Sequence, residues 1–91
     1  MRNTVSEKDI DMLKALAHPS RLKIVTVLLS RGCCNVKELV EVIQLPQSTV
    51  SQHLTKLRVS EVVKLKKSGV ESYYFVENLK VKSIIEVMLN H

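Results

Sequence analysis

The sequence has little of several features that would place its 91 residues in a common functional class. Its two glycines, Gly32 and Gly69, are too far apart to form a glycine-rich phosphate loop. No apolar stretch approaches the roughly 18 residues that indicate a membrane span, and the amino-terminal residues lack the pattern of a secretion signal. We therefore expect one domain over residues 1–91, located in the cytoplasm, with no membrane partner.

Histidine is also scarce, which argues against catalysis. The three histidines, at positions 18, 53 and 91, fall on separate predicted elements, and neither a Cys/His arrangement nor paired carboxylates are indicated by spacing. The sequence therefore predicts no enzyme activity, no catalytic residue and no cofactor.

The two cysteines, Cys33 and Cys34, are adjacent. Neighbouring Cα atoms lie about 3.8 Å apart, below the roughly 4.4 Å at which ordinary disulfide geometry begins, so an internal bridge is not expected. Cysteine is commonly a small apolar filler in a reducing compartment. The alternative is redox sensing, because a thiol near a helix end can react and disturb the elements next to it.

The most informative segment is 39–57, whose pattern predicts a helix, a break at Gln44–Pro46 and a second helix. The second helix has its apolar residues in one narrow stripe, at Val50, Leu54 and Leu57. Its opposite face is polar and nearly free of acid, with Ser48, Gln52, Thr55 and Lys56. These side chains suit phosphate oxygens and base edges, so we predict a helix-turn-helix whose second helix reads DNA.

The remaining segments predict a mainly α fold with a small β-hairpin. Helices are expected over 7–17, over 19–31 and from a cap at Asn35, followed after the reading helix by strands around 63–66 and 70–76 and a helix over 78–90. The first helix is expected to bury a side with Ile10, Leu13 and Ala17 and, near them, Met12 and Leu16. The last helix has a broad apolar stripe at Val81, Ile84, Ile85, Met88 and Leu89. Both helices are candidate surfaces for a second subunit, so we expect a homodimer.

Charge is uneven along the chain. The formal net charge is +5, and residues 56–67 alone have a balance of +4. Beside a reading helix, such a basic stretch favours a patch that tracks DNA phosphates.

The segments LAHPSRLKI at 16–24 and QSTVSQHL at 47–54, in this order of elements, resemble the ArsR/SmtB family of winged helix-turn-helix regulators. The resemblance implies a homodimer, joined through its first and last helices, that binds an imperfect inverted repeat in double-stranded DNA and usually represses transcription. Residues 45–54 together with Tyr73 and Tyr74 are especially similar to a member that controls virulence genes, which implies such targets here.

The family pattern implies contacts residue by residue. Gln47, Ser48, Ser51 and Gln52 would face the major groove. Thr49, Thr55 and Lys56 would contact phosphates, and Lys64, Lys66 and Lys67 would form the wing.

The sequence also departs from the family. Metal-sensing members have thiolates at the start of the third helix, where this sequence has Asn35, Val36 and Lys37. In the last helix, the candidate metal ligands are only Glu86 and His91. No metal site is therefore expected. Glu61 stands where glycine is common. Two alternatives to a simple repressor remain open: a winged-helix module that binds protein, and a redox-sensing repressor that uses Cys33 or Cys34.

Overall fold

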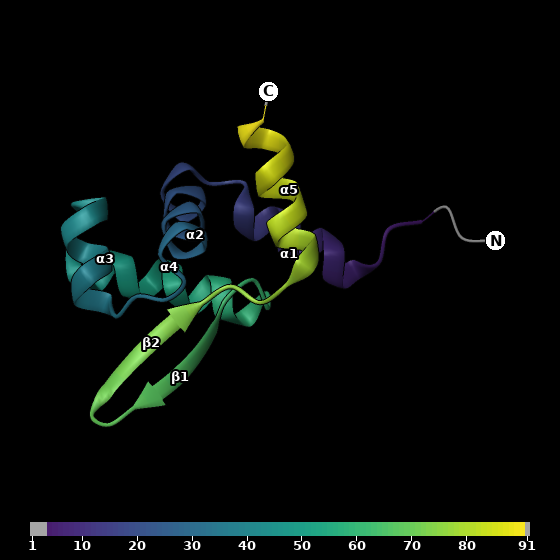
Figure 1. Ribbon diagram of the computed structural model, residues 1–91. Coiled ribbons are helices and arrows are strands. Elements are labelled where there is room, and N and C mark those ends of the chain that lie inside the picture. Colours follow the sequence, from purple (N-terminus) through teal and green to yellow (C-terminus); the bar gives the residue numbers. More distant parts are fainter. Residues whose placement is uncertain (1–3, 91) are drawn as a thin grey trace.

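A computed structural model describes residues 4–90 and contains four helices, a two-stranded antiparallel hairpin and a fifth helix (Figure 1). The elements are α1 (Glu7–Leu16), α2 (Pro19–Arg31), α3 (Val36–Ile43), α4 (Gln47–Val59), β1 (Lys64–Ser68), β2 (Glu71–Phe75) and α5 (Leu79–Leu89). This is the predicted winged helix-turn-helix order, in which α3 and α4 form the helix-turn-helix and the hairpin is the wing.

Local sequence signals set the helix ends. The side chain of Ser6 caps α1, and Asn35 and Glu38 form the predicted capping box at the start of α3. In that box the Glu38 N–H donates to Asn35 Oδ1 at 2.8 Å, and the Asn35 N–H donates to Glu38 Oε1 at 2.9 Å. Gln44 ends α3 in the left-handed conformation, with φ of 61°, which turns the chain toward Pro46 and α4.

The core lies between the helices, and the wing is attached to it. The buried side chains of this region come from α2, α3 and α4 and from the segment before β1. They are Ile24, Val25, Leu28, Leu39, Val50, Leu54, Leu57, Val62 and Val63. Cys34 and Tyr74 exchange two backbone hydrogen bonds, of 3.0 and 2.8 Å, so β2 is tied to the loop before α3. The hairpin extends from this junction, away from α1 and α5 (Figure 1).

The predicted buried side of α1 is confirmed at Met12 and Leu16 and wrong at Ile10, Leu13 and Ala17. Ile10 and Leu13 are 40% and 46% exposed and Ala17 is exposed, whereas Met12, Ala15 and Leu16 are buried. The helix also ends one residue earlier than predicted, with Ala17 as its C-cap. The cause is that α1 has two apolar sides, and it turns the side with Met12 and Leu16 toward the core.

Glu61 is the second non-glycine residue with positive φ among residues 4–90, at 60°, immediately after α4. A side chain in this left-handed region costs about 1–2 kcal/mol relative to the right-handed conformation, a cost that glycine avoids. Glu61 also forms an ion pair with Lys8 at 3.4 Å, with both side chains largely exposed, and such pairs contribute little.

Glu61→Gly is therefore expected to raise the free energy of unfolding by about 1 kcal/mol. Urea denaturation followed by circular dichroism would measure the shift. Glu61→Gln is the matched control, because it removes the charge but keeps a Cβ at positive φ. If both variants shift equally, backbone conformation is not the cause.

Candidate nucleic-acid interface

The outer face of α4 has the geometry of a reading surface. Its core side is fixed by Val50, Leu54 and Leu57, all essentially inaccessible. The residues proposed to face the major groove lie on or beside the opposite side: Gln47, Ser48 and Gln52 are exposed and Ser51 is half-buried. No acidic residue occurs between 47 and 59. The face therefore presents amide and hydroxyl groups without a charge that would repel DNA.

The residues proposed for phosphate contacts on α4 differ in availability. Lys56 is exposed, and Thr49 is half-buried. The Thr55 hydroxyl donates to the Ser51 carbonyl at 3.0 Å, so its proton is already used within the helix. Because a phosphate oxygen accepts hydrogen bonds, Thr55 would have to rotate away from Ser51 to donate to one.

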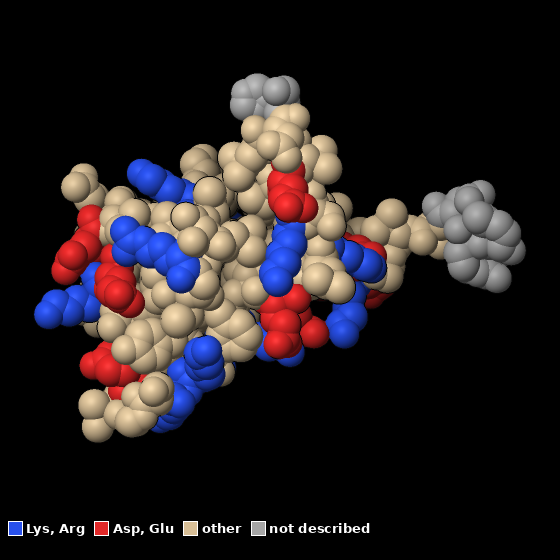
Figure 2. All heavy atoms as spheres, viewed as in Figure 1, with Lys and Arg blue, Asp and Glu red and all other residues tan. Residues whose placement is uncertain are grey.

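The three wing lysines do not share one surface. The strand register places Lys64 opposite Phe75 and Lys66 opposite Tyr73, on one face of the hairpin, while Lys67 lies on the other face opposite Ser72. Lys66 Nζ is 5.3 Å from the centre of the Phe75 ring. Figure 2 shows basic side chains gathered along this hairpin. Thus a duplex beside the wing would meet Lys64 and Lys66 together and Lys67 only near the tip.

Lys64 is further constrained by an ion pair with Glu77. Lys64 Nζ donates to Glu77 Oε1 at 2.8 Å, and both side chains are mostly exposed. Hydrogen bonding within the pair raises the pKa of Lys64 and lowers the pKa of Glu77. A phosphate contact by Lys64 therefore competes with Glu77.

His53 is half-buried on the side of α4 that meets the start of α2. Its ring centre lies 4.7 Å from that of His18, with the rings tilted by 57°. His18 Nδ1 accepts the Ser20 N–H at 3.2 Å and so caps α2, a role that requires this nitrogen to be unprotonated. Burial, followed by the nearby His18, Arg21 and Lys56, lowers the pKa of His53. The lowered pKa favours the neutral form of His53 beside His18.

The histidine pair predicts a loss of stability in acid. Because the folded-state pKa of His53 lies below its ordinary 6.5, folding favours the neutral form. The contribution is complete above pH 6.5 and is lost as pH falls from there toward the folded-state pKa. Urea unfolding at pH 8 and pH 5.5 would measure the loss, which His53→Gln should reduce. An unchanged pH dependence in the variant would show that other groups cause it.

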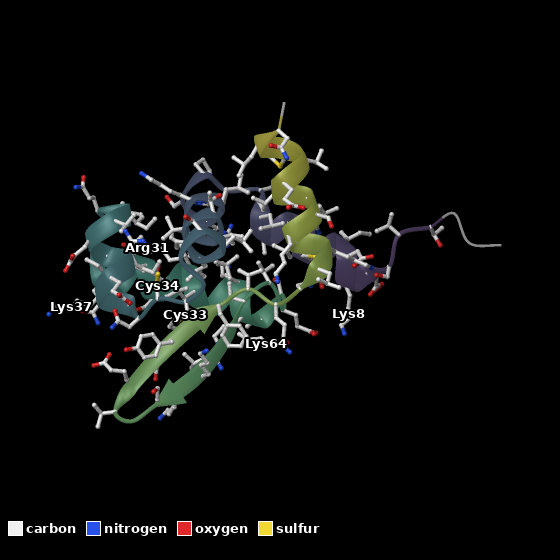
Figure 3. The ribbon with its side chains drawn as sticks, viewed as in Figure 1. Lys8, Arg31, Cys33, Cys34, Lys37 and Lys64 are labelled. Carbon is white, nitrogen blue, oxygen red and sulfur yellow. The ribbon has the colours of Figure 1, made fainter. Side chains whose placement is uncertain are left out.

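The cysteines lie at the junction of the α2–α3 loop and β2 (Figure 3). Both are free; Cys33 is half-buried and Cys34 is fully buried. Burial, with a smaller contribution from Glu38, raises the pKa of the Cys34 thiol, which disfavours the reactive thiolate. Within residues 4–90, no cluster of three or more His, Cys, Asp or Glu side chains could hold a metal ion. His91 lies outside the described residues.

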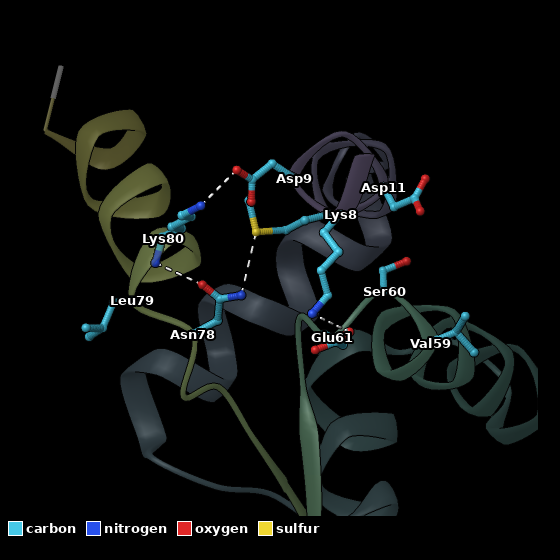
Figure 4. Close-up of a pocket in the computed structure, with 10 residues that line it drawn as sticks. Lys8, Asp9, Asp11, Val59, Ser60, Glu61, Asn78, Leu79 and Lys80 are labelled. Carbon is cyan, nitrogen blue, oxygen red and sulfur yellow. Dashed lines mark hydrogen bonds and ion pairs between the residues drawn. The ribbon is translucent and has the colours of Figure 1, made fainter. Parts of the chain in front are cut away.

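Two hollows lie where α1 meets α5. One, of about 410 Å³, is crossed by interactions that pair its charges: Lys80 with Asp9 at 2.8 Å and Lys8 with Glu61 at 3.4 Å (Figure 4). Asn78 Nδ2 also donates to Met12 Sδ at 3.7 Å. The second, of about 420 Å³, is a mainly apolar groove that includes Val5, Leu13, Leu79 and Ile84.

A third hollow, of about 600 Å³, lies beside α4 and contains residues to which the sequence analysis assigned no contact. We call it the basic cleft; its polar lining is Asp11, Lys14, Arg21, Thr55, Lys56 and Ser60. Arg21 belongs to the segment quoted for the family resemblance. The motif therefore includes this residue but does not predict that it lines a cleft beside α4. Across residues 4–90, no helix is long and apolar enough to cross a membrane.

The chain resembles known proteins in both sequence and structure. The family model for bacterial regulatory proteins of the arsR family matches residues 18–65. The transcriptional repressor PagR of Bacillus anthracis is 46% identical over 82 residues, which are 90% of this chain and 82% of the relative.

Solved structures agree over nearly the whole chain. The crystal structure of PagR has a TM-score of 0.85 and covers 90% of this chain and 93% of its own. HlyU from Vibrio cholerae has a TM-score of 0.86 at 34% identity, and covers 96% and 94%. The predicted family and fold are confirmed, and the chain belongs to the arsR family of bacterial regulatory proteins.

Proposed function

We propose that this transcriptional regulator is a homodimeric repressor that binds an inverted-repeat operator in the cytoplasm. Ser48, Ser51 and Gln52 of each subunit would read bases, and Gln47 would face the same major groove. Lys56 and the wing lysines would contact phosphates. The observation that carries the proposal is the exposed, acid-free polar face of α4 above a fully buried apolar stripe. A face built only for solubility would not require this combination.

The apolar surface of α1 and α5 supports the dimer. Exposed large apolar side chains are concentrated there, at Val5, Ile10, Leu13, Leu79, Val87, Met88 and Leu89. Exposed apolar side chains gathered on two helices of a small domain are typical of a protein interface. Two-fold pairing through it would place two α4 helices in successive major grooves, about 34 Å apart.

Related proteins support regulation but differ in its direction. PagR is named a transcriptional repressor, and HlyU of Vibrio cholerae, which is 36% identical over 83 residues, is named a transcriptional activator. We propose repression because 46% identity to PagR exceeds the identity to HlyU, and we propose virulence-associated targets from the sequence resemblance stated above.

Fluorescence anisotropy tests the proposal. The protein would be titrated into a labelled duplex from its own upstream region and into a scrambled duplex, over a salt series. We expect a salt-dependent preference for the upstream duplex at two chains per site. If neither that duplex nor fragments selected from the whole genome are preferred, the α4 face does not read DNA, and the protein-binding alternative is favoured. Repeating the titration after oxidation tests the thiol alternative, which predicts lost binding that Cys33→Ser protects.

The Lys64–Glu77 pair gives a further expectation for the wing. Lys64→Ala should weaken binding to both duplexes alike and make the salt dependence less steep, because it removes a phosphate contact. Glu77→Gln should strengthen binding to both duplexes and make the salt dependence steeper, since it releases Lys64 from its partner at 2.8 Å. The same anisotropy titrations measure both. A change in sequence preference after Lys64→Ala would contradict a phosphate role.

A further inference from the structure

The basic cleft, lined by residues of α1, α2, α4 and Ser60, has an unbalanced charge. Lys14, Arg21 and Lys56 contribute three cations, and Asp11 is the single carboxylate of the lining. The ion pairs formed within residues 4–90 are Lys8–Glu61, Lys64–Glu77 and Lys80–Asp9. None includes a cation of the basic cleft, and Asp11 is paired with none of them. These cations therefore have no ion-pair partner in the described part of the chain.

Arg21 gives a second, independent observation. Its side-chain Nε is buried and has no hydrogen-bond partner in the described structure. A buried donor left unsatisfied costs about 1–3 kcal/mol, so such a group commonly has a partner outside the chain itself. Arg21 and Lys56 both line the basic cleft, so their charges lie beside the same hollow.

The lining adds hydroxyl groups to these cations. Ser60 lines the same cleft, and Thr55 adds a second hydroxyl, which would have to rotate away from the Ser51 carbonyl to donate. Ammonium, guanidinium and hydroxyl groups therefore line one space of about 600 Å³. Guanidinium and ammonium donors with hydroxyl groups are the typical ligands of a phosphate group. We propose that the basic cleft binds a phosphate group, and that Lys14 and Arg21 extend the nucleic-acid interface from α4 onto α1 and α2.

The source favoured by position is a phosphate of the DNA backbone. Lys56 and Thr55 are shared between this cleft and the set of α4 residues proposed to contact phosphates. A duplex with its major groove on α4 has its backbone along the flank of that helix, and Thr55 and Lys56 of the cleft belong to the same helix. In this form the inference rests on the proposed function; a free oxyanion, such as inorganic phosphate, would use the same chemistry without DNA.

Substitutions in the full-length protein test the proposal. Lys14→Gln and Arg21→Gln each remove one cation, and exposed Lys14 is the safer change because Arg21 is half-buried. Lys23→Gln is the matched control, since exposed Lys23 lies on α2 outside the cleft lining. With duplex, the slope of log affinity against log salt should fall by about 1 per lost contact, hence about 2 per dimer, for both sequences. Asp11→Asn should strengthen binding.

A second arm separates the two sources. Thermal unfolding is measured with inorganic phosphate and with chloride at equal ionic strength, for the wild type and Lys14→Gln. A reduced duplex slope supports the DNA backbone as the source. An unchanged slope with loss of phosphate-specific stabilisation in Lys14→Gln supports a free oxyanion. The proposal is overturned if Lys14→Gln and Arg21→Gln have the same duplex salt slope and the same phosphate-specific stabilisation as Lys23→Gln. A wild type that binds no duplex would defeat the proposed function, while the phosphate arm would still test the cleft.

Discussion

Replacing Gln52 with alanine is expected to remove the preference for the operator over a scrambled duplex. A good amide–base contact contributes about 1–3 kcal/mol of discrimination, and a homodimer makes it twice. The substitution should therefore remove about 2–6 kcal/mol of the binding free-energy difference between the two duplexes. Gln52 is exposed on α4, in a helix whose core side is formed by Val50 and Leu54, so truncation leaves the fold intact. Ser48→Ala should act in the same direction with a smaller effect, because a hydroxyl makes one contact where an amide makes two.

The measurement is anisotropy with operator and scrambled duplexes at one salt concentration. We expect operator affinity to fall toward the scrambled value, while scrambled affinity persists because phosphate contacts supply it. Ser30→Ala, at an exposed position on α2, is the matched control. Equal losses on both duplexes would show that Gln52 contributes general affinity. A contact with another protein, unaffected by Gln52→Ala, would support the alternative function.

Local signals accounted for most of the fold. The capping box at Asn35 and Glu38, proline at the start of α2 and glycine after it each act within one helical turn, so the residues predict where helices begin and end. The α4 face was predictable for the same reason. Its buried stripe and its polar side follow from helical periodicity alone, whatever the rest of the chain does.

What could not be predicted depends on contacts between distant residues. Helical periodicity identified apolar positions in α1 but did not decide which side faces the core, and Leu13 proved exposed where Leu16 is buried. The pairing of Lys64 with Glu77 follows from the return path of the hairpin. Likewise, His18 meets His53, and Arg21 meets α4, only because α2 packs across α4. Contacts of this kind can be identified only from the tertiary structure.

The exposed side of α1 leads to the second large expected effect. Leu13 is 46% exposed and lines the apolar groove with Leu79 and Ile84 of α5. In a two-fold dimer through this groove, two Leu13 side chains would be buried, one from each subunit. Full burial of an exposed leucine side chain is worth about 1.5–3 kcal/mol. Because Leu13 is 46% exposed in the monomer, the two side chains would together contribute about 1.5–3 kcal/mol to association.

Leu13→Lys is therefore expected to convert the dimer into monomers at micromolar concentration. Lysine keeps the helix propensity of α1 but adds two ammonium groups to the interface and removes the burial of two leucines. Sedimentation equilibrium would measure the mass, with Val70→Lys as control because Val70 is fully exposed at the hairpin tip, away from α1 and α5. Operator affinity should fall with dimerisation, since a monomer holds a single half-site. A dimer that survives Leu13→Lys would place the interface outside this groove, and the two-fold arrangement of α4 helices would have to be rebuilt on another surface.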